Sequence, residues 1–459
     1  MLKKNILLKM CLFLGVGAIT VMSSVAQVQE ENLQEEYTLK EALEYALKYN
    51  TQIQNAELTE IEKDIYTKEV KSAVLPQING SASYTDNYLL PVLILPGALA
   101  GGEPGTTQQI QVGTQHNVAA GVQLSQQVFN QSVFTGLKAA KASERYYQLN
   151  TELTEEQVIE GISQLYYQVL ITKQQKEFVE RNLEQTDKLL KVAESQLENG
   201  VIKKIDLSRI KVNRTNLESQ LQNLENAYSK QLNLLKYNMG MSGETEITLA
   251  DAEIEIPAAQ ADLGDDFLND HTQLALLDQQ RELTLLEQKS FKAGYFPTLS
   301  LSMNYQYQGV SNELDFLGEN SPATWYDVGS IGVNLSVPIF DGFKKSRQLQ
   351  QSKIRMQRLE NSMSDTKELL EVEYNNALND MISSLKNLEA QQENMKLATE
   401  VYDVTQETYQ YGLASLTDLL NAETALTQAQ TEYAQALLNN KVSEINLLKS
   451  KGDLKTLVN

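Results

Sequence analysis

Hydrophobic and polar residues alternate strictly along the stretch from Pro297 to Gln308. One face carries aliphatic, methionine and tyrosine side chains, and the opposite face carries only uncharged Thr, Ser, Asn and Gln. Strict period-two alternation over about eleven residues predicts a β-strand. An uncharged polar face opposite an apolar one is typical of a membrane barrel wall, with lipid on one side and the lumen on the other. For this stretch alone, a strand of a soluble sheet is an open alternative.

The same pattern occurs four times, which favours the barrel. The sequence predicts strands at residues 77–85, 117–128, 297–308 and 328–339. Residues expected to face lipid are Leu299, Leu301, Met303, Val333 and Leu335, whereas Ser300, Ser302, Asn334 and Ser336 are expected to face the lumen. Aromatic residues collect at membrane interfaces, so the candidates for such positions are Tyr84, Tyr305, Tyr307, Trp325 and Tyr326.

The segments between the strand pairs have helical character. Phe129 to Leu197 contains no proline, and as one helix it is about 100 Å long at the usual rise per residue. No globular core encloses so long a helix, so it must pack sideways against other helices. Its second half has a heptad seam, which is interrupted at Asn199-Gly200 and resumes near Asp206. Another long helix is expected from Phe343 to Tyr411, followed by a final helix with a seam from Leu419 to Leu447.

Two shorter segments precede and join the first strands. Residues 38–73 predict a single helix, with Thr38 as N-cap and Glu41 completing a capping box. Residues 89–113 form a loop rich in Pro and Gly, with an apolar portion at 91–100. We expect this portion to pack on the protein surface. Dipping toward the membrane and capping a channel mouth are the alternatives.

The chain contains an internal repeat. Val74-Leu75-Pro76 precedes the first strand and Tyr295-Phe296-Pro297 precedes the third, at an offset of 221 residues. Asn199-Gly200 and Tyr411-Gly412 match at an offset of 212. We therefore divide the chain into a signal peptide (1–26), a first repeat (27–240), a linker (241–264) and a second repeat (265–459). Each repeat holds a helix, two strands, and two long helices joined by a turn near 200 or 412.

The composition of the chain excludes several classes of function. Residues 1–26 have a basic start, an apolar core and small residues before Gln27, as in a secretory signal, and contain the only cysteine, Cys11. The formal charge of −21 makes the chain a poor nucleic-acid binder. Only His116 and His271 are present, far apart, and no phosphate loop or nucleophile motif appears. The sequence therefore indicates no enzymatic activity, no cofactor and no metal site.

Three motifs, taken together, resemble the TolC family of outer-membrane efflux proteins over essentially the whole chain beyond the signal. They are the Phe-Pro before the third strand, the Val-Phe-Asn and Ile-Phe-Asp-Gly exits of the even strands, and the turn from Tyr409 to Ala422. The resemblance implies a mainly α-helical protein with a membrane β-barrel. Three subunits of four strands each would close a twelve-stranded barrel, continued by a helical tunnel in the periplasm of a Gram-negative bacterium.

The function that the resemblance implies is a passive exit duct for small molecules. Its partners would be a periplasmic adaptor and an inner-membrane transporter of the RND or ABC class. A duct for type I protein secretion is one alternative, and a secreted structural coiled-coil protein is an alternative of another class. Four strands cannot close a barrel in lipid, so oligomerisation also follows from the unpaired edges alone.

The resemblance places a gate beside the turns near 200 and 412. Its candidate residues are Asp206, Tyr409, Asp418 and Asn421, and the candidate adaptor-docking tips are Gly200, Val201, Gly412 and Leu413. Ala414 stands where the best-known member has a basic tether, so closure would depend on packing around Leu413, Leu416 and Leu419. Both aspartates follow a helix break and are also candidates for helix capping. We favour capping for Asp206 and the lumen for Asp418.

Overall fold

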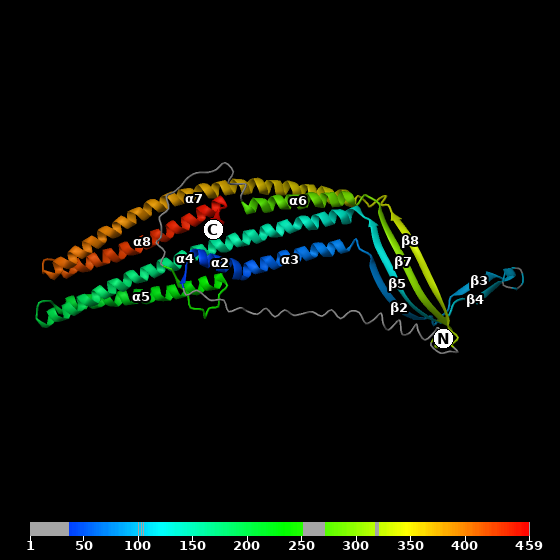
Figure 1. Cartoon of the computed structure of the whole chain (residues 1–459), viewed down its shortest axis with the longest axis horizontal. Helices are drawn as coiled ribbons and strands as arrows, with labels where there is room; N and C mark the ends of the chain where they lie inside the picture. The colour runs from blue at the N-terminus through cyan, green and yellow to red at the C-terminus, as the bar shows by residue number, and fades with distance from the viewer. Residues whose placement is uncertain are drawn as a thin grey trace.

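The structure is a computed structural model that describes residues 36–99, 101, 103, 105–250, 271–316 and 321–458. The described chain is elongated, with a layer of long helices at one end and a sheet of tilted strands at the other (Figure 1). No helix in these ranges is long and apolar enough to cross a membrane. The expected signal peptide, residues 1–26, lies outside the described residues.

The four expected strands form one antiparallel sheet in the order β2-β5-β7-β8. Their bounds are Gln77–Asp86 (β2), His116–Phe129 (β5), Thr298–Ser311 (β7) and Thr324–Ser336 (β8). The prediction of 328–339 for the last strand was wrong at both ends. The strand begins earlier because Thr324 still pairs with Val310. It ends at Ser336, and Pro338 beyond it has no N–H with which to extend a ladder.

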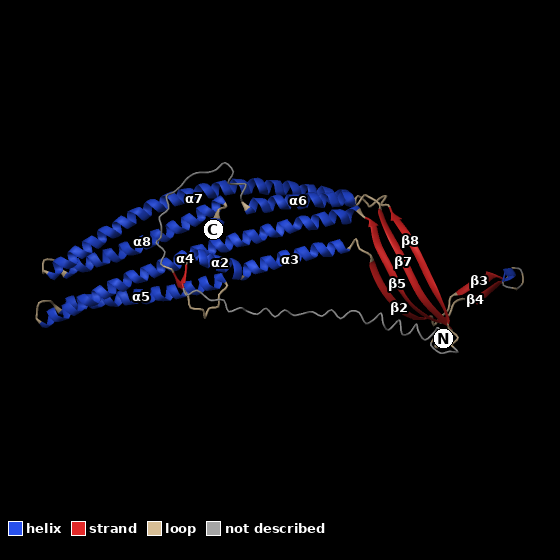
Figure 2. Ribbon diagram, viewed as in Figure 1, coloured by secondary structure: helices blue, strands red, loops and turns tan. Residues whose placement is uncertain are grey.

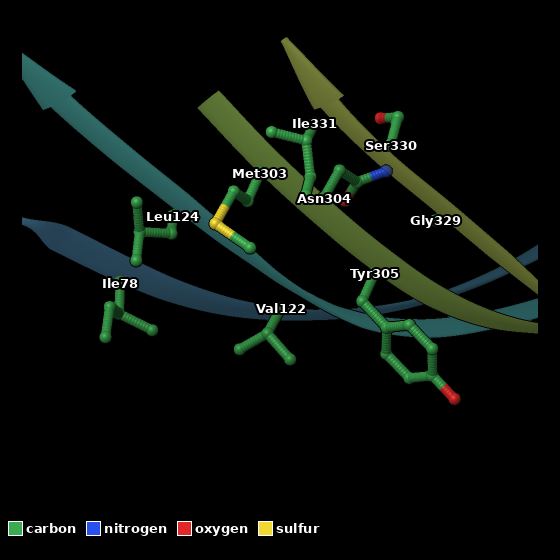
Figure 3. Close-up of a pocket in the computed structure, with 9 residues that line it drawn as sticks. All are labelled: Ile78, Val122, Leu124, Met303, Asn304, Tyr305, Gly329, Ser330 and Ile331. Atoms are coloured by element: carbon green, nitrogen blue, oxygen red, sulfur yellow. The ribbon is translucent and has the colours of Figure 1, made fainter. Parts of the chain in front are cut away.

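The strand register aligns the apolar residues on one face. Ile78, Leu124, Met303 and Ile331 are successive neighbours across the four strands and line a shallow hollow on that face (Figure 3). Leu299 lies opposite Leu335, and Leu301 opposite Val333, so all five predicted lipid-facing residues share this face. Their contact with lipid stays a prediction.

Aromatic residues gather toward the end of the sheet that is remote from the helices. The Tyr307 and Trp325 rings stack with centroids 4.9 Å apart, and Tyr305 donates a 2.9 Å hydrogen bond from its hydroxyl to Asp327. These residues and Tyr84 alternate onto the apolar face. Tyr326 pairs with Gln308 and therefore lies on the opposite face, so its assignment to a lipid interface was wrong.

The loop at 89–113 contains a hairpin that sequence reasoning missed. Val92–Pro96 (β3) pairs antiparallel with Thr107–Gln111 (β4), and the hairpin projects beyond the four-stranded sheet (Figure 1). The expected packing of this loop on the protein surface was wrong, because nearly all of its apolar side chains are exposed. Pro91 lies before these two short strands and Gly113 after them, whereas Pro96 is the last residue of β3.

The helices repeat in length as well as in order. Thr51–Ser72 (α3) and Thr272–Ala293 (α6) each have 22 residues. Gln131–Glu198 (α4) and Lys344–Gln410 (α7) have 68 and 67 residues. Lys204–Met239 (α5) and Leu416–Lys451 (α8) have 36 each. The fold is therefore internally duplicated, as the sequence predicts.

The prediction of one helix over 38–73 was wrong. Thr38 does cap Leu39–Tyr49 (α2) with Glu41 as the capping box, but the chain breaks at Asn50 and restarts as α3. The Asn50 side chain accepts from the amides of Gln52 and Ile53, and it donates to the Asn238 carbonyl near the end of α5. Residue 50 is thus fixed by a tertiary contact that helix periodicity does not report.

The main hydrophobic core lies midway along the helical layer, between α4, α5 and the short N-terminal helix. Leu43 of α2, Ile162 and Tyr166 of α4, and Leu235 of α5 are fully buried there. Two short strands, Glu36–Tyr37 (β1) and Thr248–Leu249 (β6), pair in parallel beside it. The first part of the expected linker, 241–264, therefore packs against the helices. Its remainder, and the expected helix start at 265, lie outside the described residues.

A matched pair of arginine substitutions tests the faces of β7. An Arg at Leu301 would expose a charge to hydrocarbon and cost about 2–4 kcal/mol near the bilayer midplane, whereas an Arg at Ser302 would face the lumen at much lower cost. We expect Leu301→Arg to lower the free energy of unfolding in liposomes far more than Ser302→Arg does, as measured by urea titration. Equal losses for the two variants would reject this assignment of the faces.

Candidate functional site

Two turns of nearly identical geometry close the long helices at the end remote from the sheet (Figure 1). Gly200 and Gly412 have φ values of 74° and 75°, which side chains rarely adopt. The next amide, of Val201 or Leu413, donates to a carbonyl five residues earlier, at 2.8 and 2.9 Å. This is the Schellman arrangement, and the left-handed residue that it requires explains a glycine at both positions.

The residues after these glycines are apolar and exposed. Val201 is 70% exposed and Leu413 is 82% exposed. The four candidate docking residues therefore stand at the tips, and their contact with an adaptor stays a prediction. Leu413 makes no buried contact within the described part of its own chain, so its expected part in closure stays a prediction about contacts between subunits. Leu416 and Leu419 are buried and do pack between the helices.

Asp418 caps α8. Its carboxylate accepts hydrogen bonds from the Ser415 hydroxyl at 2.7 Å and the Ser415 amide at 3.1 Å, and the Ser415 hydroxyl accepts from the Asp418 amide at 3.2 Å. These bonds hold the pKa of the Asp418 carboxyl below its usual value. The structure thus gives Asp418 a capping role, and its preferred assignment to the lumen stays untested.

Asp206 does not cap its helix, contrary to expectation. The N-cap of α5 is Lys203, which makes no capping bond from its side chain. Asp206 instead lies 3.9 Å from Arg209 and close to Tyr409. Burial and, secondly, the charge of Asp206 raise the pKa of the Tyr409 hydroxyl. Two of the gate candidates, from opposite halves of the duplicated chain, therefore come together.

Arg209 is a residue that the sequence analysis missed. Its guanidinium donates a 3.2 Å hydrogen bond to the Thr417 hydroxyl of α8, which connects the two helical hairpins. This places a basic side chain between the hairpins although Ala414 does not supply one. The spacing of Asp206 and Arg209, one helical turn apart, was the available signal. Asn421 is exposed on α8 and adds no bond to this group.

A buried carboxyl lies one turn farther along α8. Glu423 is only 5% exposed and accepts a 2.7 Å hydrogen bond from the Thr186 hydroxyl of α4. The Asn213 amide of α5 faces it without the geometry of a full hydrogen bond, and Tyr402 of α7 lies nearby. Burial raises the pKa of Glu423. Its place between the seam residues Ala422 and Leu426 was the only sequence signal.

Glu423 belongs to a polar contact between the hairpins. Asn182 of α4 donates to Thr427 at 3.2 Å and to Gln430 at 2.9 Å, both on α8. In contrast, α8 faces α7 with small and aliphatic side chains, including the buried residues Leu419, Ala422 and Leu426. Near the tips the two hairpins are therefore joined by directional hydrogen bonds as well as by the apolar cluster of Ala193, Ile210 and Leu416.

The two histidines are engaged separately. His116 lies 3.0 Å from the Tyr84 hydroxyl and 3.6 Å from Asp86, and His271 lies 3.1 Å from the Ser450 carbonyl. No group of three potential metal ligands occurs in the parts of the chain that the structure describes. The side chains described at the tips therefore contact one another by packing, helix capping and charge, and not around a metal ion held by the described residues.

Comparison with known proteins decides the family. A family model described as outer membrane efflux protein matches residues 42–240 and 263–453. This chain belongs to the outer membrane efflux protein family. The family resemblance seen in the sequence is confirmed, as are the duplicated helical fold with its strands and the location in the outer membrane, with the helical part in the periplasm.

Individual proteins with known names are similar to this chain over most of its length. Outer membrane protein TolC of Vibrio cholerae is 24% identical over 410 residues, which are 84% of this chain and 83% of that protein. The pyoverdine export outer membrane protein OpmQ of Pseudomonas aeruginosa is 23% identical, covering 69% and 65%. The solved structure of outer membrane protein VceC of Vibrio cholerae superimposes with a TM-score of 0.67 at 16% identity, covering 90% and 96%. Family members form channels of efflux and secretion systems.

Glu423 makes a prediction about pH. Because its pKa in the folded protein lies above the ordinary value of 4.5, its contribution to stability is complete below pH 4.5 and is lost as pH rises through the raised pKa. Glu423→Gln keeps an acceptor for Thr186 but cannot ionise. We therefore expect the variant to lose less melting temperature than the wild type between acid and neutral pH.

Glu432→Gln is the matched control, since Glu432 lies on the same helix, is not buried, and accepts a 2.9 Å hydrogen bond from the Gln428 side chain. It should follow the wild type. Parallel melting curves for the wild type and Glu423→Gln across this pH range would contradict the assignment.

Proposed function

We propose that three copies of this chain form the outer-membrane exit duct of a tripartite efflux pump. The duct passively conducts small toxic compounds from the periplasmic side to the exterior. A periplasmic adaptor connects it to an inner-membrane transporter of the RND or ABC class, which supplies the energy. The observation that carries the proposal is that both layers of the chain end in unpartnered edges.

The sheet supports this first. Its outer strands, β2 and β8, each pair on one side only within the described chain. An unpaired strand edge in lipid leaves backbone groups without hydrogen bonds, and each such group costs roughly several kcal/mol. A sheet that spans the membrane must therefore close. Pairing β8 of one copy with β2 of the next closes the ring, and three copies of four strands give twelve.

The helical layer supports the same arrangement. Figure 2 shows α7 and α5 on opposite sides of this layer near the tips. Leu397, Val401 and Val404 of α7 are exposed, as are Ile205 and Val212 of α5. Two different apolar edges on one subunit suit a head-to-tail contact that closes into a ring.

The tips complete the proposal. In a trimer, three copies each of Asp206 and Asp418 surround one axis, with Tyr409 and Asn421 close by. Such a ring of carboxylates attracts cations at low salt. The exposed Val201 and Leu413 offer the adaptor six apolar points at the rim of the duct.

Small molecules are the favoured substrates because OpmQ, a relative over 69% of the chain, is named for pyoverdine export. Type I protein secretion remains the alternative that an experiment must separate. Membership of a family of outer-membrane channels removes the secreted coiled-coil alternative.

Two substitutions of Asp418 distinguish the effect of its negative charge on the channel from its effect as a helix cap. Asp418→Asn keeps an oxygen that accepts from Ser415 and removes the negative charge, whereas Asp418→Ala loses both. We expect the asparagine variant to lose part of the cation preference of single channels in planar bilayers while melting close to the wild type. An asparagine variant with unchanged selectivity and unchanged divalent block would make Asp418 a cap alone.

A deletion strain tests the function itself. We expect loss of the gene to lower the inhibitory concentration of several toxic compounds by several-fold and to leave secreted proteins unchanged, because the duct serves a small-molecule pump. The complementing plasmid should restore resistance. Retained resistance together with a missing secreted protein would replace efflux with secretion.

A further inference from the structure

Among the described residues, none covers the apolar face of the β3–β4 hairpin, whose side chains are largely exposed. Leu93 lies opposite Ile110, and Leu95 opposite Gln108, so one face is mainly aliphatic. The other face places Gln109 opposite Ile94 and Gln111 opposite Val92. Leu93 and Ile110 are both more than 40% exposed. Both faces thus expose aliphatic side chains, but the face of Leu93, Leu95 and Ile110 is the more aliphatic one, because the other face alternates Val92 and Ile94 with amides.

Such a hairpin needs a covering surface. An isolated two-stranded hairpin is at best marginally stable in water, and an aliphatic face is normally buried against another element. We propose that this face packs against the same face of the other two copies, so that three hairpins meet across the outer mouth of the duct. This inference rests on the proposed trimer.

A polar collar separates the hairpin from the lipid-facing part of the sheet. At its base, Asp86 lies 3.6 Å from His116, and the Asn87 side chain donates to the Thr114 carbonyl at 3.0 Å. Asn312, from the β7–β8 connection, accepts from the Gln115 amide at 3.1 Å. These groups lie beyond the aromatic residues Tyr84 and Trp325, where the chain leaves the apolar region. Hydrocarbon is therefore not the natural cover for the hairpin.

Charge argues against a lipid headgroup as well. Residues 87–115 contain no Lys or Arg, and Glu103 is their only charged residue. Headgroups in membranes are commonly anionic and are held by basic side chains. A surface without basic residues suits contact between identical copies, since nothing in it repels a second copy of itself except the lone glutamate.

The position and reach of the hairpin also fit. It begins at the end of β2, the edge strand that must pair with a neighbouring copy, so it continues that interface outward. A twelve-stranded barrel is roughly 24 Å across, given strands about 4.8 Å apart and tilted by about 40°. A five-residue strand such as β3 is about 17 Å long, which exceeds the barrel radius. Three hairpins folded over the rim therefore meet at the axis.

An aliphatic constriction of this kind gates by excluding water. Its opening would not depend on the carboxylates at the periplasmic tips. The duct would thus have a second barrier, at its exit, that differs in chemistry from the first.

Disulfide trapping tests the contact. The only cysteine of the sequence is Cys11, within the expected signal peptide, so an introduced cysteine is unique in the remaining chain. Leu93→Cys should give covalent dimers on mild oxidation of whole cells, because one of three symmetric thiols is left over. Gln109→Cys, on the other face of the same hairpin, is the matched control and should form no covalent dimer, as read from boiled, non-reducing gels.

Aspartate substitutions at the same positions test the barrier. Leu93→Asp should push the three hairpins apart, raise single-channel conductance at least twofold and admit large antibiotics, whereas Gln109→Asp should change neither. Absence of a disulfide at residue 93, or wild-type conductance for Leu93→Asp, would overturn the proposal.

Trimer assembly is read separately, from SDS-resistant oligomers of the cysteine variants in outer-membrane extracts. Trimers without the disulfide would reject only the hairpin contact. Absence of trimers in the wild type and both variants would reject the trimeric duct and the hairpin contact together.

Discussion

The unpaired backbone groups along β2 and β8 are the constraint on which the rest of the molecule depends. Lipid offers no hydrogen bonds, so a sheet with two open edges must be closed in a membrane, and in the proposed trimer identical copies complete it. Once copies must close into a ring, the helices that continue from the strands are brought around the same axis. The same closure brings α7 of one copy beside α5 of the next. This explains why both helices expose apolar side chains at their outer edges.

Helix α8 contacts α7 mainly by apolar packing, and it contacts α4 by both hydrogen bonds and apolar packing. Toward α7 it presents Leu419, Ala422 and Leu426, and such packing is roughly proportional to the area buried and insensitive to direction. Toward α4 it presents Glu423, Thr427 and Gln430, whose hydrogen bonds require defined distances and angles. The contact between the hairpins thus combines these hydrogen bonds with the packing of Leu416 against Ala193 and Ile210.

Patterns of local origin were predictable from the sequence, and contacts between distant segments were not. Alternation gave the strands and their faces, and the repeat gave matched helices of nearly equal length. Missed features depended on partners far along the chain: the break at Asn50 on Asn238, and the burial of Glu423 on Thr186. The bridge from Arg209 to Thr417 joins residues 208 positions apart, so no local window contains both. The β3–β4 hairpin was hidden because its strands are short and differ in composition.

The two turns at the tips have the same backbone conformation but differ in how the N-terminus of the following helix is capped. After Gly412, Ser415 and Asp418 satisfy each other's backbone amides, whereas after Gly200 the side chain of Lys203 caps nothing. A ring of three copies therefore has pseudo-sixfold shape but only threefold chemistry. In the proposed ring, tips with and without a side-chain cap therefore alternate around the rim. Any protein that binds there meets two kinds of binding position in alternation, so a partner with six equivalent subunits would have to use them in two different ways.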